Sequence, residues 1–472
     1  MENNMVESTS VIDILVQKAR AAQEKIAGYT QEQIDEVCKA IAWQVYKDDN
    51  IEKLARLAVD ETGMGKYEDK VTKHKNKVLG IINDVIKEKT VGLIERNEAK
   101  GISKYAKPIG VIGALTPVTN PTATPSSNAV AILKGKNAVI FAPHPRAKAA
   151  TKLAIDFMRQ GLKIVGAPED LIQVVEEPSI EITGELMRKV DLVVATGGSA
   201  MVKSAYSSGK PAYGVGPGNS CQIIAEDADV EDAAAKITTS KTFDNATSCS
   251  SENSIIIQNS IYDSMINALV TRGGYLCSES EKAKLKEWMW RPNKHGSLVI
   301  NADIVAKSAC EIAKGAGITV PEDTKMLLVK GDMPLEEDLF AEEKLSPVLT
   351  IYNYQDFNEG IQILTRLTDN CGKGHSCGIH TFNKDYIEYL GQNMRTSRII
   401  VRQPQAAANG GMFANGMPST TTLGCGTWGN NITTENICSK HFINVTWVSE
   451  PIALNRPADE EIWSDYFSKY GK

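Results

Sequence analysis

From Ile109 onward the chain alternates short apolar runs with stretches of helical periodicity, and no other feature limits its fold as strongly. The expected strands are the runs Val111–Leu115, Asn137–Ala142, Ile172–Val175 and Asp191–Thr196, and the expected helices between them are 128–134 and 148–160. A strand that is apolar along its whole length, rather than at alternate residues, is buried on both faces. Strands that alternate with helices form parallel sheets covered on both faces, so the pattern predicts a doubly wound α/β fold.

A second α/β block begins near Lys241, whereas the first hundred residues have helical periodicity. Its expected strands are 254–258, 298–301, 325–329, 348–352, 378–380 and 398–402, with one more at 442–448. The apolar stripes of the N-terminal helices are Val11, Leu15, Ala19 and Ala22, followed by Ile34, Val37, Ile41 and Val45. No repeat or low-complexity linker separates the two blocks. We therefore expect them to pack together, with a ligand-binding cleft between them.

Composition and charge exclude several classes of function. The 472 residues suffice for two or three domains with full cores. A net charge of -6 argues against nucleic acid as a partner, because phosphate binding requires a basic surface. No run approaches the ~18 apolar residues of a membrane span, and the acidic N-terminus does not resemble a secretory signal. The nine cysteines are odd in number and show no CxxC spacing, which predicts no disulfide framework, no metal site and a cytoplasmic location.

Cys249 is the candidate nucleophile. It lies in the small, polar segment Thr-Ser-Cys-Ser-Ser, directly before the expected strand 254–258. A thiol in such a segment can reach a substrate and attack it. Ser250 and Ser251 leave room around the sulfur, and Thr247, Ser248 and Ser250 are candidate contacts for a substrate.

Asn120 follows the first expected strand, in the segment Leu115-Thr-Pro-Val-Thr-Asn120. Its amide either satisfies backbone groups of a proline-rich turn or donates to a developing oxyanion, where one such donor is worth ~3 kcal/mol. The choice between the two depends on a partner thiol.

Three loops are candidates for binding a dinucleotide. Phe141-Ala-Pro-His144-Pro-Arg146 follows a strand and has no carboxylate before Asp156, so it permits a 2′-phosphate or forms only a basic helix start. Thr196-Gly197-Gly198 allows close backbone approach at a strand end, although paired glycines alone are a weak signal. The glycines of the segment 213–220, Gly216 among them, indicate close approach to a ligand or a surface loop.

Glu343 and His375 have no unambiguous role by local sequence. Glu343 precedes a Ser-Pro strand entry and either accepts hydrogen bonds from ribose or is one exposed acid of the run 336–343. His375, between glycine and serine, is a better site candidate than Cys425.

Taken in order, these motifs resemble the aldehyde dehydrogenase superfamily, and more closely its CoA-acylating branch. The resemblance covers essentially the whole chain. It rests on Thr116-Pro-Val-Thr-Asn-Pro-Thr, on Tyr206 to Asn219, on Phe243 to Ser254, on Glu343-Lys-Leu-Ser-Pro and on Leu423-Gly-Cys-Gly-Thr-Trp-Gly. It implies NADP or NAD as cofactor, CoA and a small aldehyde as partners, and a homodimer or homotetramer. It also implies a cofactor-binding domain at 1–240, a catalytic domain at 241–427 and a C-terminal segment at 428–472 that serves the oligomer interface.

By matching position, the resemblance assigns the roles of individual residues. Cys249 is the nucleophile, and the Asn120 amide and the Cys249 backbone N–H form the oxyanion hole. Glu343 holds the nicotinamide ribose. The other residues expected near the cofactor are Thr116, Pro117, His144, Arg146, Thr196, Gly197, Gly198 and Gly216.

The segment 213–220 also favours the acylating branch on chemical grounds. Hydrolytic relatives place a glutamate there as general base for water, whereas this chain has no acidic residue from Tyr213 to Ser220. Water is a poor nucleophile without a base, but a thiol is intrinsically strong and needs none. The resemblance favours sulfoacetaldehyde as substrate, then succinate semialdehyde, then acetaldehyde. Arg402 is a candidate contact for the anionic head group, or a solvent-exposed arginine at a strand end.

Overall fold

Five parallel strands form the first sheet of the computed structural model, which describes residues 9–472. They are β3 (Val111–Leu115), β4 (Ala138–Ala142), β5 (Ile172–Val174), β6 (Leu192–Thr196) and β7 (Ala212–Val215). Their order is β5-β4-β3-β6-β7, so the chain starts in the middle, builds outward to one side and then returns to build the other. Ligands of such sheets bind beyond the carboxyl ends of the strands where this direction changes, here between β3 and β6.

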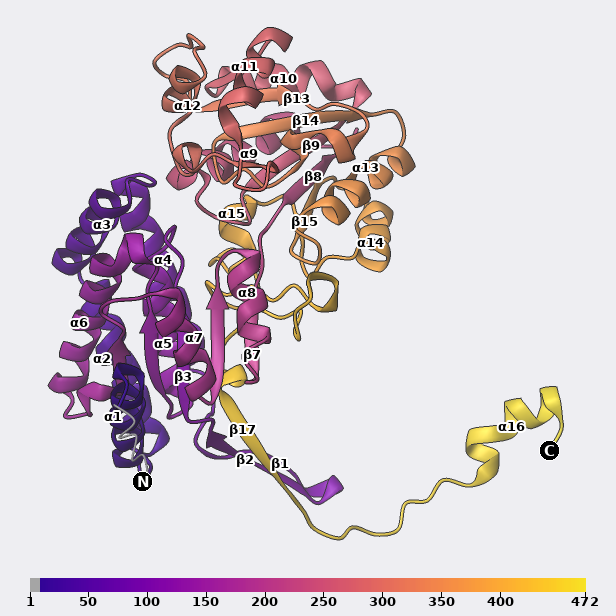
Figure 1. Ribbon diagram of the computed structural model, residues 1–472. Helices are drawn as coiled ribbons and strands as arrows, with labels where there is room; N and C mark the ends of the chain where they lie inside the picture. Colours follow the sequence, from indigo (N-terminus) through magenta and orange to yellow (C-terminus); the bar gives the residue numbers. More distant parts are fainter. Residues whose placement is uncertain (1–8) are drawn as a thin grey trace, which may run out of the picture.

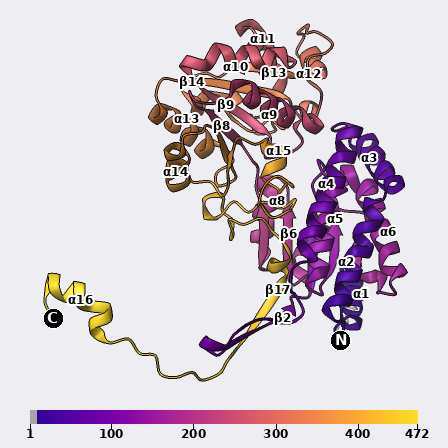
Figure 2. The ribbon, with the colours of Figure 1, turned by 180° about the vertical axis from the view of Figure 1, so that it is seen from behind.

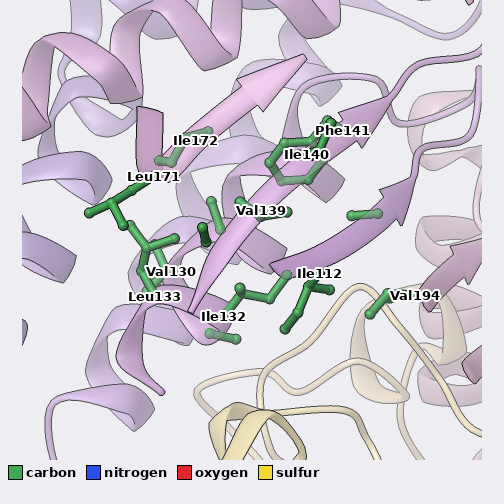
Figure 3. Packing of buried hydrophobic residues seen from close by; sticks show 14 of the residues in the cluster. Ile112, Val130, Ile132, Leu133, Val139, Ile140, Phe141, Leu171, Ile172 and Val194 are labelled. Atoms are coloured by element: carbon green, nitrogen blue, oxygen red, sulfur yellow. The ribbon is translucent and has the colours of Figure 1, made fainter. Parts of the chain in front are cut away.

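Helices cover this sheet and close its core. They are α1 (Val11–Lys25), α2 (Gln31–Tyr46), α3 (Asp48–Thr62), α4 (Tyr67–Val85), α5 (Ala123–Lys134), α6 (Lys148–Ile164), α7 (Ile180–Lys189) and α8 (Ser199–Tyr206). Figure 3 shows Ile112, Val139 and Ile140 of the strands packed beside Val130 and Leu133 of α5. The strands β3 and β4 are buried at every residue, as their uninterrupted apolar sequence requires.

The second sheet has seven parallel strands in the order β10-β13-β14-β9-β8-β15-β16. Their bounds are β8 (Ser220–Ile224), β9 (Glu252–Gln258), β10 (Gly274–Leu276), β13 (Met326–Lys330), β14 (Val348–Tyr354), β15 (Cys377–His380) and β16 (Ile399–Val401). Its helices are α9 (Val230–Thr242), α10 (Tyr262–Thr271), α11 (Glu279–Met289), α12 (Ala309–Gly315), α13 (Phe357–Asn370), α14 (Lys384–Asn393) and α15 (Gln405–Ala408). The predicted doubly wound α/β fold with two parallel sheets is confirmed.

The strand ends of the two sheets face each other. β7 ends at Val215 and β8 begins at Ser220, so residues 216–219 carry the chain from the carboxyl edge of the first sheet to the amino edge of the second. Figure 1 shows the helix-covered sheets one above the other, joined at this point. The segments that precede β9, β14 and β15 therefore face the carboxyl edge of the first sheet. Cys249, Glu343 and His375 lie in those segments.

A third sheet and a tail extend away from this body. β1 (Gly92–Asn97), β2 (Ile102–Pro108) and β17 (Ile443–Ser449) pair antiparallel, and α16 (Asp459–Tyr470) follows an extended segment. Figure 2 shows this arm from behind, projecting from the base of the first sheet. Among residues 9–472 no helix is long and apolar enough to cross a membrane.

Three sequence predictions need correction. The second sheet begins with β8 at Ser220, so the boundary predicted at residue 240 divides that sheet; no linker composition marks the change, because the connection has four residues, 216–219. Val11 is 61% exposed, while Ile12 faces the core, because Val11 is the first residue of α1 and lies outside the buried stripe. The strand expected at 298–301 is β12 (Leu298–Ile300), which pairs only with β11 (Trp290–Pro292) in a separate hairpin.

Candidate active site

A cavity of about 990 Å³ lies where the two sheets meet. Most of the predicted site residues line it: Pro117, Asn120, His144, Thr196, Gly197, Gly198, Gly216, Thr247, Ser248, Cys249, Ser250 and Glu343. Residues from six separate segments thus converge on one space, which is the cleft that the sequence predicts. Thr116, Arg146, His375 and Arg402 are not part of its wall.

The loop that presents Cys249 begins with an unusual backbone. Asp244, Asn245 and Ala246 have φ values of 50°, 51° and 58° in succession. Left-handed backbone costs a residue with a side chain roughly 1–2 kcal/mol, so three in a row persist only if other contacts hold them. The turn places Cys249 at the amino end of β9 with its side chain toward the cavity.

Asp244 supplies those contacts. Its buried carboxylate accepts from the Lys66 backbone N–H at 2.9 Å, from Lys70 Nζ at 3.2 Å and from Lys73 Nζ at 2.5 Å, and from the Thr247 hydroxyl at 2.7 Å. Burial alone would raise the pKa of Asp244, but Lys73 and Lys70 outweigh it, and the pKa is lowered. One carboxylate therefore ties α4 to the turn before Cys249.

His375 is the nearest titratable neighbour of Cys249. Its Nε2 lies 3.2 Å from Cys249 Sγ, and its side chain is fully buried behind the sulfur. Burial raises the pKa of the Cys249 thiol to about 12. Burial, and then the charge of Arg398, lowers the pKa of His375 to about 3. The resting pair is therefore a neutral thiol beside a neutral imidazole that can accept its proton.

A chain of hydrogen bonds sets the direction of that proton transfer. Gln405 Oε1, an acceptor, receives the Ser220 hydroxyl at 2.5 Å, so Ser220 Oγ is left to accept from Ser376 Oγ at 3.3 Å. Ser376 Oγ in turn accepts from His375 Nδ1 at 2.8 Å. With the proton on Nδ1, His375 Nε2 carries a lone pair toward Cys249. The Gln405 amide is itself oriented by Asn409 Nδ2, 3.1 Å from Oε1.

Asn120 is held with its donor free. Lys73 Nζ donates to Asn120 Oδ1 at 3.0 Å, which fixes the carbonyl side of the amide. The NH₂ group then points away from Lys73, and Asn120 lines the same cavity as Cys249. The arrangement suits an oxyanion donor rather than a satisfied turn residue.

The segment 216–219 passes close to Cys249. A Cβ on Gly218 would lie 1.9 Å from the Cys249 carbonyl oxygen, so only glycine fits there. The Gly218 N–H donates to Glu343 Oε1 at 2.9 Å. Burial raises the pKa of Glu343 to about 8 despite that bond and the nearby Lys241 and Lys344. Glu343 is therefore a cavity residue, not one exposed acid of a surface run.

The carboxyl edge of the first sheet is open where a nucleotide would bind. The N-terminus of α8 has Gly198 as its cap and no side-chain cap, and nothing lies within 4 Å of a Cβ built on Gly198 or Gly216. The free N–H groups and the open space suit a pyrophosphate. Thr116 is buried, with its N–H bonded to Ala142 O, so it supports the edge from below.

The loop after β4 was expected to have no carboxylate near it, and this expectation is incomplete. His144 lines the cavity, and Arg146 is exposed beside it. The loop has no carboxylate of its own, but Glu61 of α3 accepts from the backbone N–H groups of Ala149 and Ala150 at 2.9 and 2.7 Å. A carboxylate from a distant helix thus occupies the start of α6, which local sequence cannot reveal.

Two predicted substrate contacts do not hold. Arg402 donates to the Thr381 carbonyl beyond the carboxyl end of β15, and its guanidinium lies 4.4 Å from the centre of the Phe382 ring. It therefore does not face the cavity. Thr247 lines the cavity, but its hydroxyl proton is already donated to Asp244. Ser248 and Ser250 share a hydrogen bond at 2.8 Å, which leaves one hydroxyl free to donate to a ligand.

Several residues of the site were not predicted from the sequence. Lys73 and Lys77 of α4 line the cavity, Arg398 donates to the His375 carbonyl at 2.8 Å, and Gln405 anchors the hydrogen-bond chain. Only the lysines left a usable signal, since Lys70, Lys73 and Lys77 recur on one face of a helix. Within residues 9–472 no three His, Cys, Asp or Glu side chains gather as they would around a metal ion.

Comparison with known proteins gives the same family that the sequence motifs resemble. Residues 6–422 match the aldehyde dehydrogenase family. A sulfoacetaldehyde dehydrogenase of Acholeplasma sp. is 63% identical over 96% of this chain and 93% of its own. An acylating sulfoacetaldehyde dehydrogenase of Bilophila wadsworthia is 57% identical over 96% and 98%. An acetylating succinate-semialdehyde dehydrogenase of Clostridium kluyveri is 44% identical over 95% and 98%.

Solved structures agree with the fold. An acetylating aldehyde dehydrogenase from Geobacillus thermoglucosidasius has a TM-score of 0.90 and 35% identity over 95% of this chain and 98% of that chain. A propionaldehyde dehydrogenase from Rhodopseudomonas palustris, solved with CoA and an acylated cysteine, has a TM-score of 0.83 and 29% identity over 93% and 97%. An engineered glycolyl-CoA reductase with bound NADP+ has a TM-score of 0.82 and 29% identity over 93% and 96%.

Proposed function

This chain belongs to the aldehyde dehydrogenase family, and we propose that it oxidises sulfoacetaldehyde to sulfoacetyl-CoA with NAD(P)+ and CoA. It is an acylating aldehyde dehydrogenase. The observation that carries the chemistry is the contact between Cys249 Sγ and His375 Nε2 in a cavity whose sheet-to-sheet segment has no carboxylate.

In the first step the Cys249 sulfur forms a bond to the aldehyde carbon while its proton moves to His375 Nε2. The carbonyl oxygen becomes an oxyanion, which accepts hydrogen bonds from the Asn120 amide and the Cys249 backbone N–H. Arg398 holds the His375 backbone, and the chain to Gln405 keeps the accepting nitrogen toward the sulfur. His375 then releases the proton to solvent.

The residues present fit a nicotinamide dinucleotide. Gly197 and Gly198 with the free N-terminus of α8 would hold the pyrophosphate, His144 would face the adenosine end with Arg146 exposed beside it, and Glu343 would face the nicotinamide ribose. When bound, the cofactor accepts the hydride that leaves the thiohemiacetal carbon. Asn120 and Cys249 hold that carbon in place, and the product on the enzyme is a Cys249 thioester.

The acyl group then leaves Cys249 for CoA. His375, neutral again, accepts the CoA thiol proton, and the thiolate attacks the thioester carbonyl with Asn120 again facing the oxyanion. The Cys249 thiolate departs and is protonated by His375. Water is a poorer nucleophile than a thiol, and residues 213–220 supply no carboxylate to activate it. Each step is reversible.

The choice of aldehyde is tested by comparing rates. We expect kcat/KM with CoA to be highest for sulfoacetaldehyde, then succinate semialdehyde, then acetaldehyde, measured as NAD(P)H formation with mass-spectrometric identification of the acyl-CoA. A higher kcat/KM for succinate semialdehyde would favour that aldehyde as the substrate. The cavity wall that carries the lysines of α4 would then face a carboxylate instead of a sulfonate.

We further propose that the enzyme is a cytoplasmic homo-oligomer assembled through its arm. Large apolar side chains of β17 and α16 are solvent-exposed in the single chain, including Trp447, Ile462, Trp463 and Tyr466. Such a surface is unfavourable in water and suits a contact with a second copy. All nine cysteines are free thiols, as a reducing compartment requires. Deletion of residues 451–472 should lower the number of chains per particle, measured by size-exclusion chromatography with light scattering. An unchanged number of chains would show that α16 is not part of the interface.

A further inference from the structure

A row of lysines on α4 forms one wall of the catalytic cavity. Lys70, Lys73 and Lys77 follow at helical spacing, and Lys73 and Lys77 line the cavity together with Cys249. The three ammonium groups differ sharply in their partners, and that difference indicates what the wall is for.

The first two lysines already share a counter-ion. Lys70 and Lys73 both bind the Asp244 carboxylate, at 3.2 and 2.5 Å. The remaining donors of Lys73 go to Asn120 Oδ1 at 3.0 Å and Thr247 Oγ1 at 2.6 Å. An ammonium has three donors, so Lys73 has none to spare for a ligand.

Lys77 has no such counter-ion. Its Nζ donates to the Gly410 carbonyl at 2.8 Å, and across residues 9–472 no carboxylate forms an ion pair with it. A Cβ on Gly410 would lie 2.6 Å from that Nζ, so the backbone of the loop 409–421 is shaped around the ammonium. Asp84, the carboxylate on the same wall, accepts instead from the Ser419 backbone N–H at 2.8 Å.

Lys77 and Cys249 line the same cavity. Burial, and then the charge of Lys73, lowers the pKa of Lys77 to about 8, whereas a negative charge on Cys249 raises it. With a pKa of about 8, Lys77 remains mostly protonated at pH 7. A cation with little solvent and no counter-ion is unfavourable unless a bound anion completes it.

We propose that Lys77 binds the anionic head group of the aldehyde while Cys249 attacks the carbonyl, and so determines the preference for anionic over neutral aldehydes. This inference rests on the proposed function. In sulfoacetaldehyde one methylene separates the sulfonate from the carbonyl carbon, so the head group stays within the cavity once the carbon is bonded to Cys249. The ammonium supplies its two remaining N–H donors to the sulfonate oxygens, and a carboxylate would be bound in the same way.

The test compares Lys77→Met with Lys77→Arg and a matched control. The control is Lys75→Met, because Lys75 lies on the same helix but pairs with Asp48 at the surface. The readout is the ratio of kcat/KM for sulfoacetaldehyde to that for propionaldehyde, with circular dichroism to verify folding. Losing a charge-assisted hydrogen bond should lower this ratio about 10- to 100-fold in Lys77→Met. Lys77→Arg should restore most of it, and Lys75→Met should leave it unchanged.

Other outcomes distinguish a failure of the inference about Lys77 from a failure of the proposed function. A ratio that is unchanged in folded Lys77→Met, while the wild type makes acyl-CoA, overturns the role of Lys77 and leaves the proposed function standing. A rise in KM for CoA or NADP+ without a change in the ratio assigns Lys77 to a phosphate and also overturns it. If the wild type forms no acyl-CoA from any aldehyde, the proposed function fails and the inference with it.

Discussion

Cys249 and His375 form a pair that rests without charge. Reactive cysteines are commonly activated in advance by a lowered pKa, whereas burial here raises the pKa of Cys249 to about 12 and lowers that of His375 to about 3. Proton transfer across 3.2 Å therefore accompanies attack on the substrate instead of preceding it. A thiol stored in this form resists adventitious oxidation, since the thiolate is the form that reacts.

The resting state predicts how labelling depends on pH. The fraction of thiolate rises with pH until the pKa is reached, so inactivation by iodoacetamide should accelerate about tenfold per pH unit from pH 7 to 10, without a plateau. The measurement is the inactivation rate of ligand-free enzyme, with the Cys249 peptide followed by mass spectrometry. A plateau near pH 7 would show a preformed thiolate and contradict the account of the pair.

At the scale of elements, α4 and the turn 244–246 form one unit through Asp244. Removing one partner of a buried ion pair leaves uncompensated charge, here on Lys70 and Lys73. We expect Asp244→Asn to lower the free energy of unfolding by about 3–5 kcal/mol and to reduce kcat, because the turn that positions Cys249 loses its anchor. Urea unfolding and steady-state kinetics measure the two effects.

The control for that change is Asp232→Asn, since Asp232 pairs with Lys236 on the exposed side of α9. Its effect should stay below about 1 kcal/mol. Because the pKa of Asp244 is lowered in the folded protein, its contribution is present above the pKa of the unfolded chain and is lost as the pH falls toward the folded value. The wild type should therefore lose more stability than Asp244→Asn between pH 5 and 3. Equal losses would contradict the anchor.

The elements also show what sequence alone could predict. Buried strands such as β3, β4 and β6 were predicted to within a residue, because their apolar runs have no other stable environment. The exposed strand β1, the half-buried β2 and the short edge strand β10 were missed, since such strands carry little hydrophobic pattern. The buried strands β7 and β8 were also missed, because glycines and the polar residues Ser220 and Gln222 interrupt their apolar runs. The roles of Gln405 and Glu61 could not be predicted, because their partners lie 185 and 88 residues away in the chain.

At the scale of the whole molecule, the cavity exists only because the strand ends of two sheets face each other. The first presents the carboxyl ends of its strands, and the second presents the loops before β9, β14 and β15. The four residues that join the sheets, 216–219, include no carboxylate that could act as a general base for water, and Gly218 leaves no room for a larger side chain. The sequence indicated the missing carboxylate, and the structure adds the neutral base beside the sulfur.

The central claim is that the acyl group passes from Cys249 to CoA and not to water. The most direct test measures NAD(P)H formation from sulfoacetaldehyde with and without CoA, in the wild type and in Cys249→Ala. We predict steady turnover and sulfoacetyl-CoA only when wild-type enzyme and CoA are both present, at most a single burst without CoA, and no turnover by folded Cys249→Ala. Sustained NAD(P)H formation without CoA, or normal turnover by Cys249→Ala, would contradict the account.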